Sequence, residues 1–80
     1  MSTADRVVAT IVDVTGEPAV RSNRDLDLFE HQVLDSLRTI ELLVALTEHF
    51  GTDIALSEVE RELWATPNKI IAFMEQRVGA

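Results

Sequence analysis

Ser36 is the residue of this 80-residue chain whose type and setting are best suited to chemistry. It stands in the stretch "VLDSLRTIELL" (33–43), where a loop gives way to an amphipathic helix. A serine hydrolase needs a base within hydrogen-bond reach and an oxyanion hole. His31 precedes Ser36 by five residues, and His49 follows it by more than three helical turns. Neither spacing pairs the serine with a base, so hydrolysis is the least favoured interpretation.

The position of Ser36 leaves two other interpretations of its hydroxyl. A serine at the start of a helix most often serves as a cap or a first-turn residue. Asp35, directly before it, is an equally good N-cap. If Asp35 caps the helix, Ser36 presents an exposed hydroxyl at the positive end, where the helix dipole and free backbone N–H groups favour an attached phosphate.

No other residues form a catalytic or metal-binding pattern. His31 and His49 share no metal-ligand spacing, so both are expected on the surface. The chain has no cysteine, which excludes disulfides, thiolate metal sites and a cysteine nucleophile. Its three glycines are scattered, so there is no phosphate-binding loop. The run "EVERE" (58–62) is expected to be a solvated helix face, and Trp64 a buried anchor whose indole N–H is hydrogen-bonded.

The composition describes one small acidic domain, residues 1–80. Fourteen acidic residues against seven basic ones give a net charge of -7, which argues against nucleic acid and anionic membranes and favours partners with basic patches. No apolar run reaches the ~18 to 20 residues of a membrane helix. The N-terminus lacks a secretory pattern, so the expected compartment is the cytoplasm, without membrane insertion.

Two long helices are predicted with clear ends. The first runs from about Thr3 to Val14 on the spacing of its apolar residues, with Ser2 or Thr3 as the cap and Gly16 as the stop. The second runs from Asp35 or Ser36 to Phe50, and Gly51 ends it. Between them, residues 15–34 have no strong period and form a long loop. Five apolar side chains can anchor that loop: Leu26, Leu28, Phe29, Val33 and Leu34.

Two further helices complete the expected fold. A short one begins at Ser57, which has the spacing of a capping box with Glu60, and turns Val59, Leu63 and Trp64 inward. The last begins at Thr66 as the cap, with Pro67 in the first helical position. Its core stripe comprises Ile70, Ile71, Met74 and Val78. The predicted fold class is all-α: a small four-helix bundle with three longer helices, one short helix and a long first loop.

The helix from 36 to 50 has two distinct faces. One is an ordinary core stripe: Thr39, Leu42, Leu43, Leu46 and Phe50. The other mixes apolar and acidic residues: Leu37, Ile40, Glu41, Val44 and Glu48. Either Ile40 and Val44 touch the loop while Glu41 and Glu48 are merely solvated, or this face is a docking surface for a partner with an apolar, basic patch.

The segment "LDSLRTIELLVALTEHFG" resembles the attachment site and following helix of an acyl carrier protein. In that family an Asp-Ser-Leu motif is followed on the same helix by T-x-E-L, which Thr39, Glu41 and Leu42 match. The stretches "DLDLFEHQVLDS" and "ALSEVERELWATPNKI" are similar to the D-alanyl carrier proteins, with residues 64–68 the most distinctive match. Arg38 departs from the pattern, because D-alanyl carriers have a small residue there and fatty-acid carriers often an acid.

The resemblance implies a carrier and not an enzyme. A phosphopantetheinyl transferase would move 4′-phosphopantetheine from coenzyme A onto Ser36, with Asp35 as motif residue and cap. A ligase would adenylate an amino acid, D-alanine on this resemblance, and load it as a thioester. The monomeric carrier would then deliver it to a downstream acceptor, as in D-alanylation of teichoic acids. Recognition by these partners would fall on Leu37, Arg38, Ile40, Glu41, Val44 and Glu48.

Two alternatives stay open at this point. The first keeps the carrier class but changes the cargo to a fatty-acyl, polyketide or other aminoacyl or peptidyl intermediate. The second belongs to another class: a small acidic helical adaptor in which Ser36 is only a helix cap.

Overall fold

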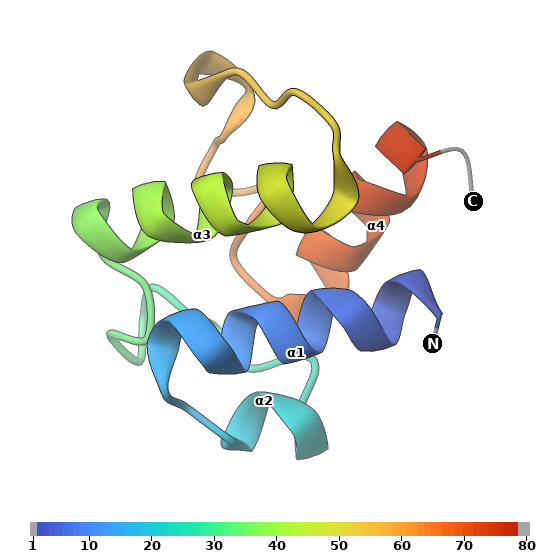
Figure 1. Cartoon of the computed structure of the whole chain (residues 1–80). Coiled ribbons are helices and arrows are strands. Elements are labelled where there is room, and N and C mark those ends of the chain that lie inside the picture. The colour runs from blue at the N-terminus through green and yellow to red at the C-terminus, as the bar shows by residue number, and fades with distance from the viewer. Residues whose placement is uncertain (1, 79–80) are drawn as a thin grey trace.

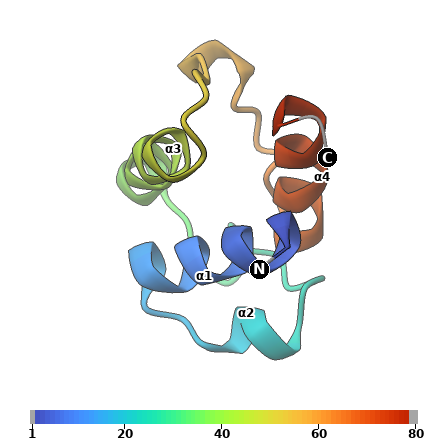
Figure 2. The same ribbon diagram turned by 45° about the vertical axis from the view of Figure 1, so that its right-hand side comes forward.

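The computed structural model describes residues 2–78, and within that range every regular element is helical. The elements are α1 (Thr3–Thr15), α2 (Ala19–Ser22), α3 (Ser36–Phe50), the 3-10 turn η1 (Leu56–Glu58) and α4 (Pro67–Val78). Helix α1 contacts α2, α3 and α4, with α3 and α4 on one side of it and α2 on the other (Figures 1 and 2). The all-α bundle is therefore confirmed, with α1 at its centre.

The ends of α1 follow the sequence signals. The Ser2 hydroxyl accepts a hydrogen bond of 3.1 Å from the Asp5 N–H, which confirms Ser2 as the N-cap. At the other end Gly16 adopts φ 70°, the left-handed conformation that glycine accommodates without strain, and its N–H bonds the Val12 carbonyl at 2.7 Å. The predicted start and stop of this helix are confirmed, with the last turn extended by one residue to Thr15.

The core lies where α1, α3 and α4 meet. Fourteen apolar side chains are buried there, contributed by all the α-helices and by the loops between them. From α3 they are Leu42, Leu43 and Leu46, and from α4 Ile70, Ile71 and Met74. The predicted core stripes of both helices are confirmed, with Thr39, Phe50 and Val78 only half-buried at the edges.

The loop between α1 and α3 is anchored as expected but is not wholly irregular. Leu28 and Leu34 are buried, and the Leu28 N–H donates to the Ala65 carbonyl at 2.7 Å. The loop also contains the single-turn helix α2, which the sequence did not predict. Four residues are too few to show a period, and α2 is held by the complete burial of Val20 against the core.

The prediction for the segment before α4 was partly wrong. No capping box joins Ser57 and Glu60; instead the Glu58 carboxylate accepts the Ala55 N–H at 2.9 Å and pairs with Arg77. These bonds fix a short 3-10 turn at 56–58, and turns follow as far as Trp64. The one-turn helix of this bundle is thus α2 and not the segment after Ser57.

The burial of side chains in this segment also differs from the prediction. Trp64 is fully buried, but Leu63 is 45% exposed and did not turn inward. The Trp64 ring packs edge-on against Phe73, with centroids 5.7 Å apart. Its indole N–H has no hydrogen-bond partner within residues 2–78, so the expected bond is not formed. The helix α4 starts as predicted, with the Thr66 hydroxyl accepting the Lys69 N–H at 3.2 Å.

None of the helices formed by residues 2–78 is long and apolar enough to cross a membrane.

Candidate cofactor-attachment site

Asp35 caps α3, and this leaves the Ser36 hydroxyl without a structural task. Asp35 is extended, with φ -134° and ψ -172°, and its Oδ1 accepts the Arg38 N–H at 2.8 Å. Ser36 is the first residue of the helix and is exposed. Its hydroxyl forms no hydrogen bond with any part of the chain that the structure describes. The interpretation of Ser36 as the helix cap is therefore wrong.

The surroundings of the Ser36 hydroxyl suit a phosphate. The first backbone N–H groups of an α-helix have no partner within the helix, and they point outward at its positive end. A phosphate attached to the first residue of α3 would lie beside them. The chain thus offers an exposed oxygen for modification and a local field that favours the negative charge of the group attached.

Arg38 lies two residues further on, in the same first turn of α3, and its side chain reaches back to α1. Its Nη1 donates to the Thr15 carbonyl at 3.0 Å and to the Val14 carbonyl at 3.5 Å. The last turn of α1 has no basic residue of its own, so Arg38 supplies the positive charge that a helix C-terminus favours. The guanidinium expected to take part in partner recognition therefore also joins the start of α3 to the end of α1.

The mixed face of α3 is open to solvent. Leu37, Ile40 and Val44 are 67%, 45% and 52% exposed. About half of the surface of Ile40 and of Val44 is therefore open to solvent, and Ile40 also lines a groove together with the loop residues Phe29 and Leu34. Glu41 and Glu48 are exposed on the same helix. We call this set the recognition face: Leu37, Arg38, Ile40, Glu41, Val44 and Glu48.

A groove of about 550 Å³ opens beside Ser36, between the start of α3 and the segment around η1. Its polar lining comprises Asp35, Ser36, Thr39 and Arg61, and its apolar lining Phe29, Leu34, Ile40, Leu56 and Val59. An exposed hydroxyl, a helix N-terminus and an arginine beside an apolar groove fit a long group that begins with a phosphate.

The hydroxyl of Thr39, which lines this groove, differs from three other threonine hydroxyls in the helices. Thr10, Thr15 and Thr47 each donate their hydroxyl to the carbonyl four residues earlier, at 2.8, 2.7 and 2.9 Å. The Thr39 hydroxyl is buried and has no partner within residues 2–78. A buried hydroxyl without a partner is unusual in a folded protein. The unpaired atom belongs to a residue that lines the groove one turn beyond Ser36.

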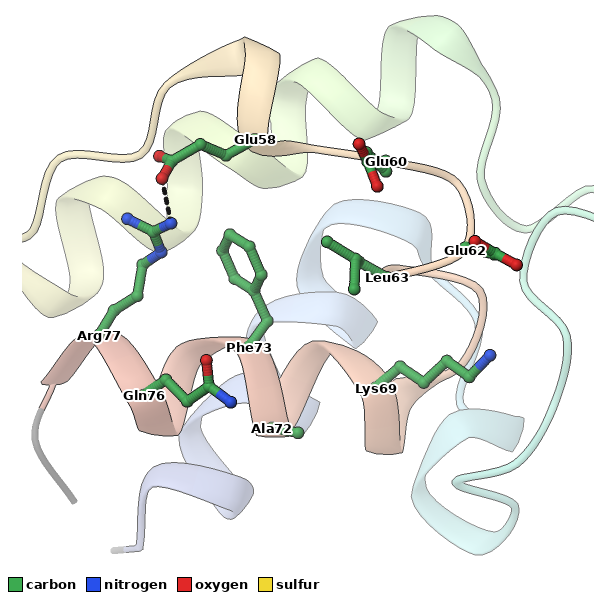
Figure 3. Close-up of a pocket in the computed structure, with 9 residues that line it drawn as sticks. All are labelled: Glu58, Glu60, Glu62, Leu63, Lys69, Ala72, Phe73, Gln76 and Arg77. Atoms are coloured by element: carbon green, nitrogen blue, oxygen red, sulfur yellow. Dashed lines mark hydrogen bonds and ion pairs between the residues drawn. The ribbon is translucent and has the colours of Figure 1, made fainter.

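A larger groove, of about 680 Å³, lies on another face of the molecule (Figure 3). It separates α4 from the segment 58–63 and includes no residue of α3. The Glu58–Arg77 ion pair closes one end of it, and the Arg77 guanidinium stacks on Phe73 at 4.6 Å. These contacts hold the segment before α4 against that helix, so the groove is separate from the site at Ser36.

The histidines are on the surface, as predicted. Both side chains are exposed, and within residues 2–78 no group of acidic and histidine side chains is placed to hold a metal ion. The backbone carbonyl of His49 accepts a hydrogen bond from the Arg6 guanidinium, which joins the end of α3 to the start of α1.

Residues 5–74 match the protein family described as a phosphopantetheine attachment site. The match begins in α1, crosses the loop that contains α2 and the whole of α3, and ends in α4. The chain belongs to this family. Members carry 4′-phosphopantetheine covalently, so this protein is a carrier that other enzymes modify and load, and it is not itself a catalyst. It interacts with a phosphopantetheinyl transferase and with loading and accepting enzymes.

Within this family, the chain is similar to several curated D-alanyl carrier proteins. The chain is 49% identical over 70 residues to a D-alanyl carrier protein of Lacticaseibacillus rhamnosus, covering 88% of this chain and 86% of the relative. It is 47% identical to the protein of the same name from Lacticaseibacillus casei strain BL23, with the same coverage. A third D-alanyl carrier protein, from Enterococcus faecalis, is 39% identical over 75 residues, or 94% of this chain and 96% of the relative.

The contacts of Arg61 and Arg38 were not predicted from the sequence. The sequence predicts Arg61 in a solvated run, but Arg61 lines the groove beside Ser36 and stacks on Phe29, with 5.1 Å from its guanidinium carbon to the ring centroid. The sequence predicts only partner recognition for Arg38, which also bonds the end of α1. Both depend on contacts across more than twenty residues, and neither leaves a local pattern in the sequence.

Proposed function

We propose that Ser36 is the residue that carries 4′-phosphopantetheine. The observation that carries this proposal is that Asp35, and not Ser36, caps the helix. Asp35 accepts the Arg38 N–H and caps α3, while the Ser36 hydroxyl is exposed and unbonded in the described part of the chain. A transferase brings its own catalytic base, so Ser36 needs none from this chain.

The bound group supplies a terminal thiol, which this cysteine-free chain lacks, to hold an acyl group as a thioester. The contribution of the chain is to place that group and to present it. The N-terminus of α3 offsets the negative charge of the phosphate. Tethering raises the effective concentration of the cargo at each partner enzyme.

We propose D-alanine as the cargo. The relatives named D-alanyl carrier proteins align with most of this chain at 39% to 49% identity. In this scheme a D-alanine ligase uses ATP to adenylate the amino acid and transfers it to the thiol of the carrier. The carrier then delivers it to a downstream acceptor, as in D-alanylation of teichoic acids.

The cargo is tested by loading the modified protein. Holo protein is incubated with a D-alanine-activating ligase, ATP and either D-alanine or L-alanine, and the adduct is measured by intact mass before and after hydroxylamine. We expect a hydroxylamine-labile adduct with D-alanine. If this ligase leaves the holo protein unloaded while a fatty-acyl, polyketide or other aminoacyl ligase loads it, the cargo assignment is overturned and the carrier class stands.

We further propose that the recognition face is where partner enzymes dock. Exposed apolar residues beside carboxylates, on a chain of net charge -7, suit transient partners with apolar and basic patches. We propose that residues 1–80 act as a single carrier domain and as a monomer in the cytoplasm, where coenzyme A and ATP are at hand. Sedimentation of the holo protein tests the monomer.

A further inference from the structure

Arg61 is a cation without an acidic partner, held over an aromatic ring. Its guanidinium lies 5.1 Å from the ring centroid of Phe29 and is exposed. The ion pairs within residues 2–78 join Arg24 to Asp5 and Arg77 to Glu58, and neither involves Arg61. Stacking on an aromatic face restricts a guanidinium while leaving its N–H groups free to donate. Arg61 is therefore oriented but unpaired in this part of the chain.

In the segment that contains Arg61, the acidic side chains line one groove and the arginine lines another. Glu60 and Glu62 line the groove beside α4, where Figure 3 shows them on the segment facing that helix. Arg61, between them in sequence, lines the other groove together with Ser36. Among residues 2–78, the only other ionisable residue that lines this second groove is Asp35, whose carboxylate accepts the Arg38 N–H. One cation thus faces the groove of Ser36, and the adjacent carboxylates do not.

We propose that Arg61 binds the phosphate of the group attached to Ser36. This inference rests on the proposed attachment at Ser36 and names a positioning residue for it. A phosphodiester there adds a negative charge beside Asp35 on an already acidic chain, and a guanidinium facing the same groove offsets it. The planar fork of arginine matches two phosphate oxygens, and stacking on Phe29 has already restricted the side chain.

This contact would hold the start of the attached group at the groove beside Ser36. The apolar lining of that groove includes Phe29 and Leu56, which the rest of the group could contact. The groove meets the recognition face at Ile40, whereas Leu37 and Glu41 do not line it. A group held in the groove would therefore leave Leu37 and Glu41 open to a docked partner.

The experiment compares Arg61→Gln with Arg21→Gln, which removes an exposed arginine from α2 at a different pocket and so changes the net charge equally. Both variants and the wild type are converted to the holo form, confirmed by intact mass, and their folding is checked by thermal unfolding. The readout is the ³¹P resonance of the holo protein, recorded at low salt and at about 1 M salt, where the Debye length is about 3 Å. Arg61→Lys is the conservative variant.

In the wild type and Arg21→Gln we expect the ³¹P chemical shift to differ from that of an unfolded peptide that carries the same modification. As salt is raised, we expect this difference to shrink. In Arg61→Gln we expect both the difference and its salt dependence to be lost, and in Arg61→Lys partly restored. If no variant gains mass at Ser36, the proposed attachment fails. If Arg61→Gln gains mass and gives the wild-type ³¹P resonance and salt response, the attachment stands and the role of Arg61 is overturned.

Discussion

The guanidinium of Arg38 donates a hydrogen bond of 3.0 Å to the backbone carbonyl of Thr15, and so joins the first turn of α3 to the last residue of α1. The two residues are 23 positions apart. The whole loop that contains α2 is closed at this contact. Ser36 stands two residues before Arg38, so the contact also fixes where the attachment site begins.

Replacing Arg38 with alanine is expected to lower the free energy of unfolding. Hydrogen bonds that involve a charged group contribute about 1.5 to 3 kcal/mol, and since Arg38 is exposed we expect the lower end of that range. Urea unfolding measures the change. Arg21→Ala removes an exposed arginine that makes no such bond, and we expect it to fall within about 0.5 kcal/mol of the wild type. Equal losses in the two variants would contradict the role of Arg38.

Substitution of Asp35 is expected to lower stability, whereas substitution of Ser36 is expected to leave it nearly unchanged. Asp35→Ala removes the N-cap and should cost about 0.5 to 2 kcal/mol of stability. Ser36→Ala removes a hydroxyl that is unbonded in the described structure, so we expect its stability to stay within about 0.5 kcal/mol of the wild type. Asp35→Asn, which can still accept the Arg38 N–H, should retain most of the stability. A larger loss in Ser36→Ala than in Asp35→Ala would show that the serine is the cap.

Glu41 and Glu48 are expected to affect the rate of encounter with partners. Changing either to lysine should slow association with a phosphopantetheinyl transferase, and the slowing should shrink as salt screens the charge. Stopped-flow association rates across a salt series measure this. Glu75→Lys is the matched control, because Glu75 is exposed on α4, away from the recognition face. If Glu75→Lys slows association as much, the effect comes from net charge and not from a docking face.

Glu58 makes stability depend on pH. The hydrogen bond from the Ala55 N–H, and then the Arg77 guanidinium, hold the pKa of Glu58 below its ordinary value of 4.5. A carboxyl whose pKa is lower in the folded state stabilises the fold above its unfolded pKa, and this contribution is lost as the pH falls through the folded pKa. The wild type should therefore exceed Glu58→Gln in stability at pH 7, and the difference should shrink below pH 4.5.

Urea unfolding from pH 7 to pH 3 measures that difference. Glu62→Gln is the control, since Glu62 is exposed and forms no ion pair in the described part of the chain. A stability difference between wild type and Glu58→Gln that stays constant across this pH range would contradict the prediction.

Adjacent residues Leu63 and Trp64 should differ sharply in their effect on stability. Trp64→Ala removes a fully buried side chain and should cost about 3 to 5 kcal/mol, a large part of the stability of so small a domain. Leu63→Ala removes a side chain that is 45% exposed and should cost much less. Thermal unfolding of both variants measures the contrast. Comparable losses would mean that Leu63 packs inward after all.

Where the sequence carried a complete local signal, the structure follows it. The helices α1, α3 and α4 each have a cap, a sustained apolar period and, for the first two, a glycine stop, so their positions were predictable. Asp35 and Ser36 were placed correctly at the start of α3 for the same reason.

Short segments and distant contacts were not predictable. The position of α2 depends on burying Val20, and the turn at 56–58 depends on a pair between Glu58 and Arg77, nineteen residues apart. The contacts of Arg38 and Arg61 likewise arise only when the chain has folded. Propensity yields to tertiary contacts in such places, which is why a capping box predicted at Ser57 did not form.

The most direct test of the central claim is the mass and position of the modification. Wild type and Ser36→Ala are incubated with coenzyme A and a broad-specificity phosphopantetheinyl transferase, and intact mass is followed by fragmentation of the modified peptide. We expect the wild type to gain one phosphopantetheine, located on Ser36, and the folded Ser36→Ala variant to gain none. A wild type that stays unmodified, or a Ser36→Ala variant that is modified, would contradict the account.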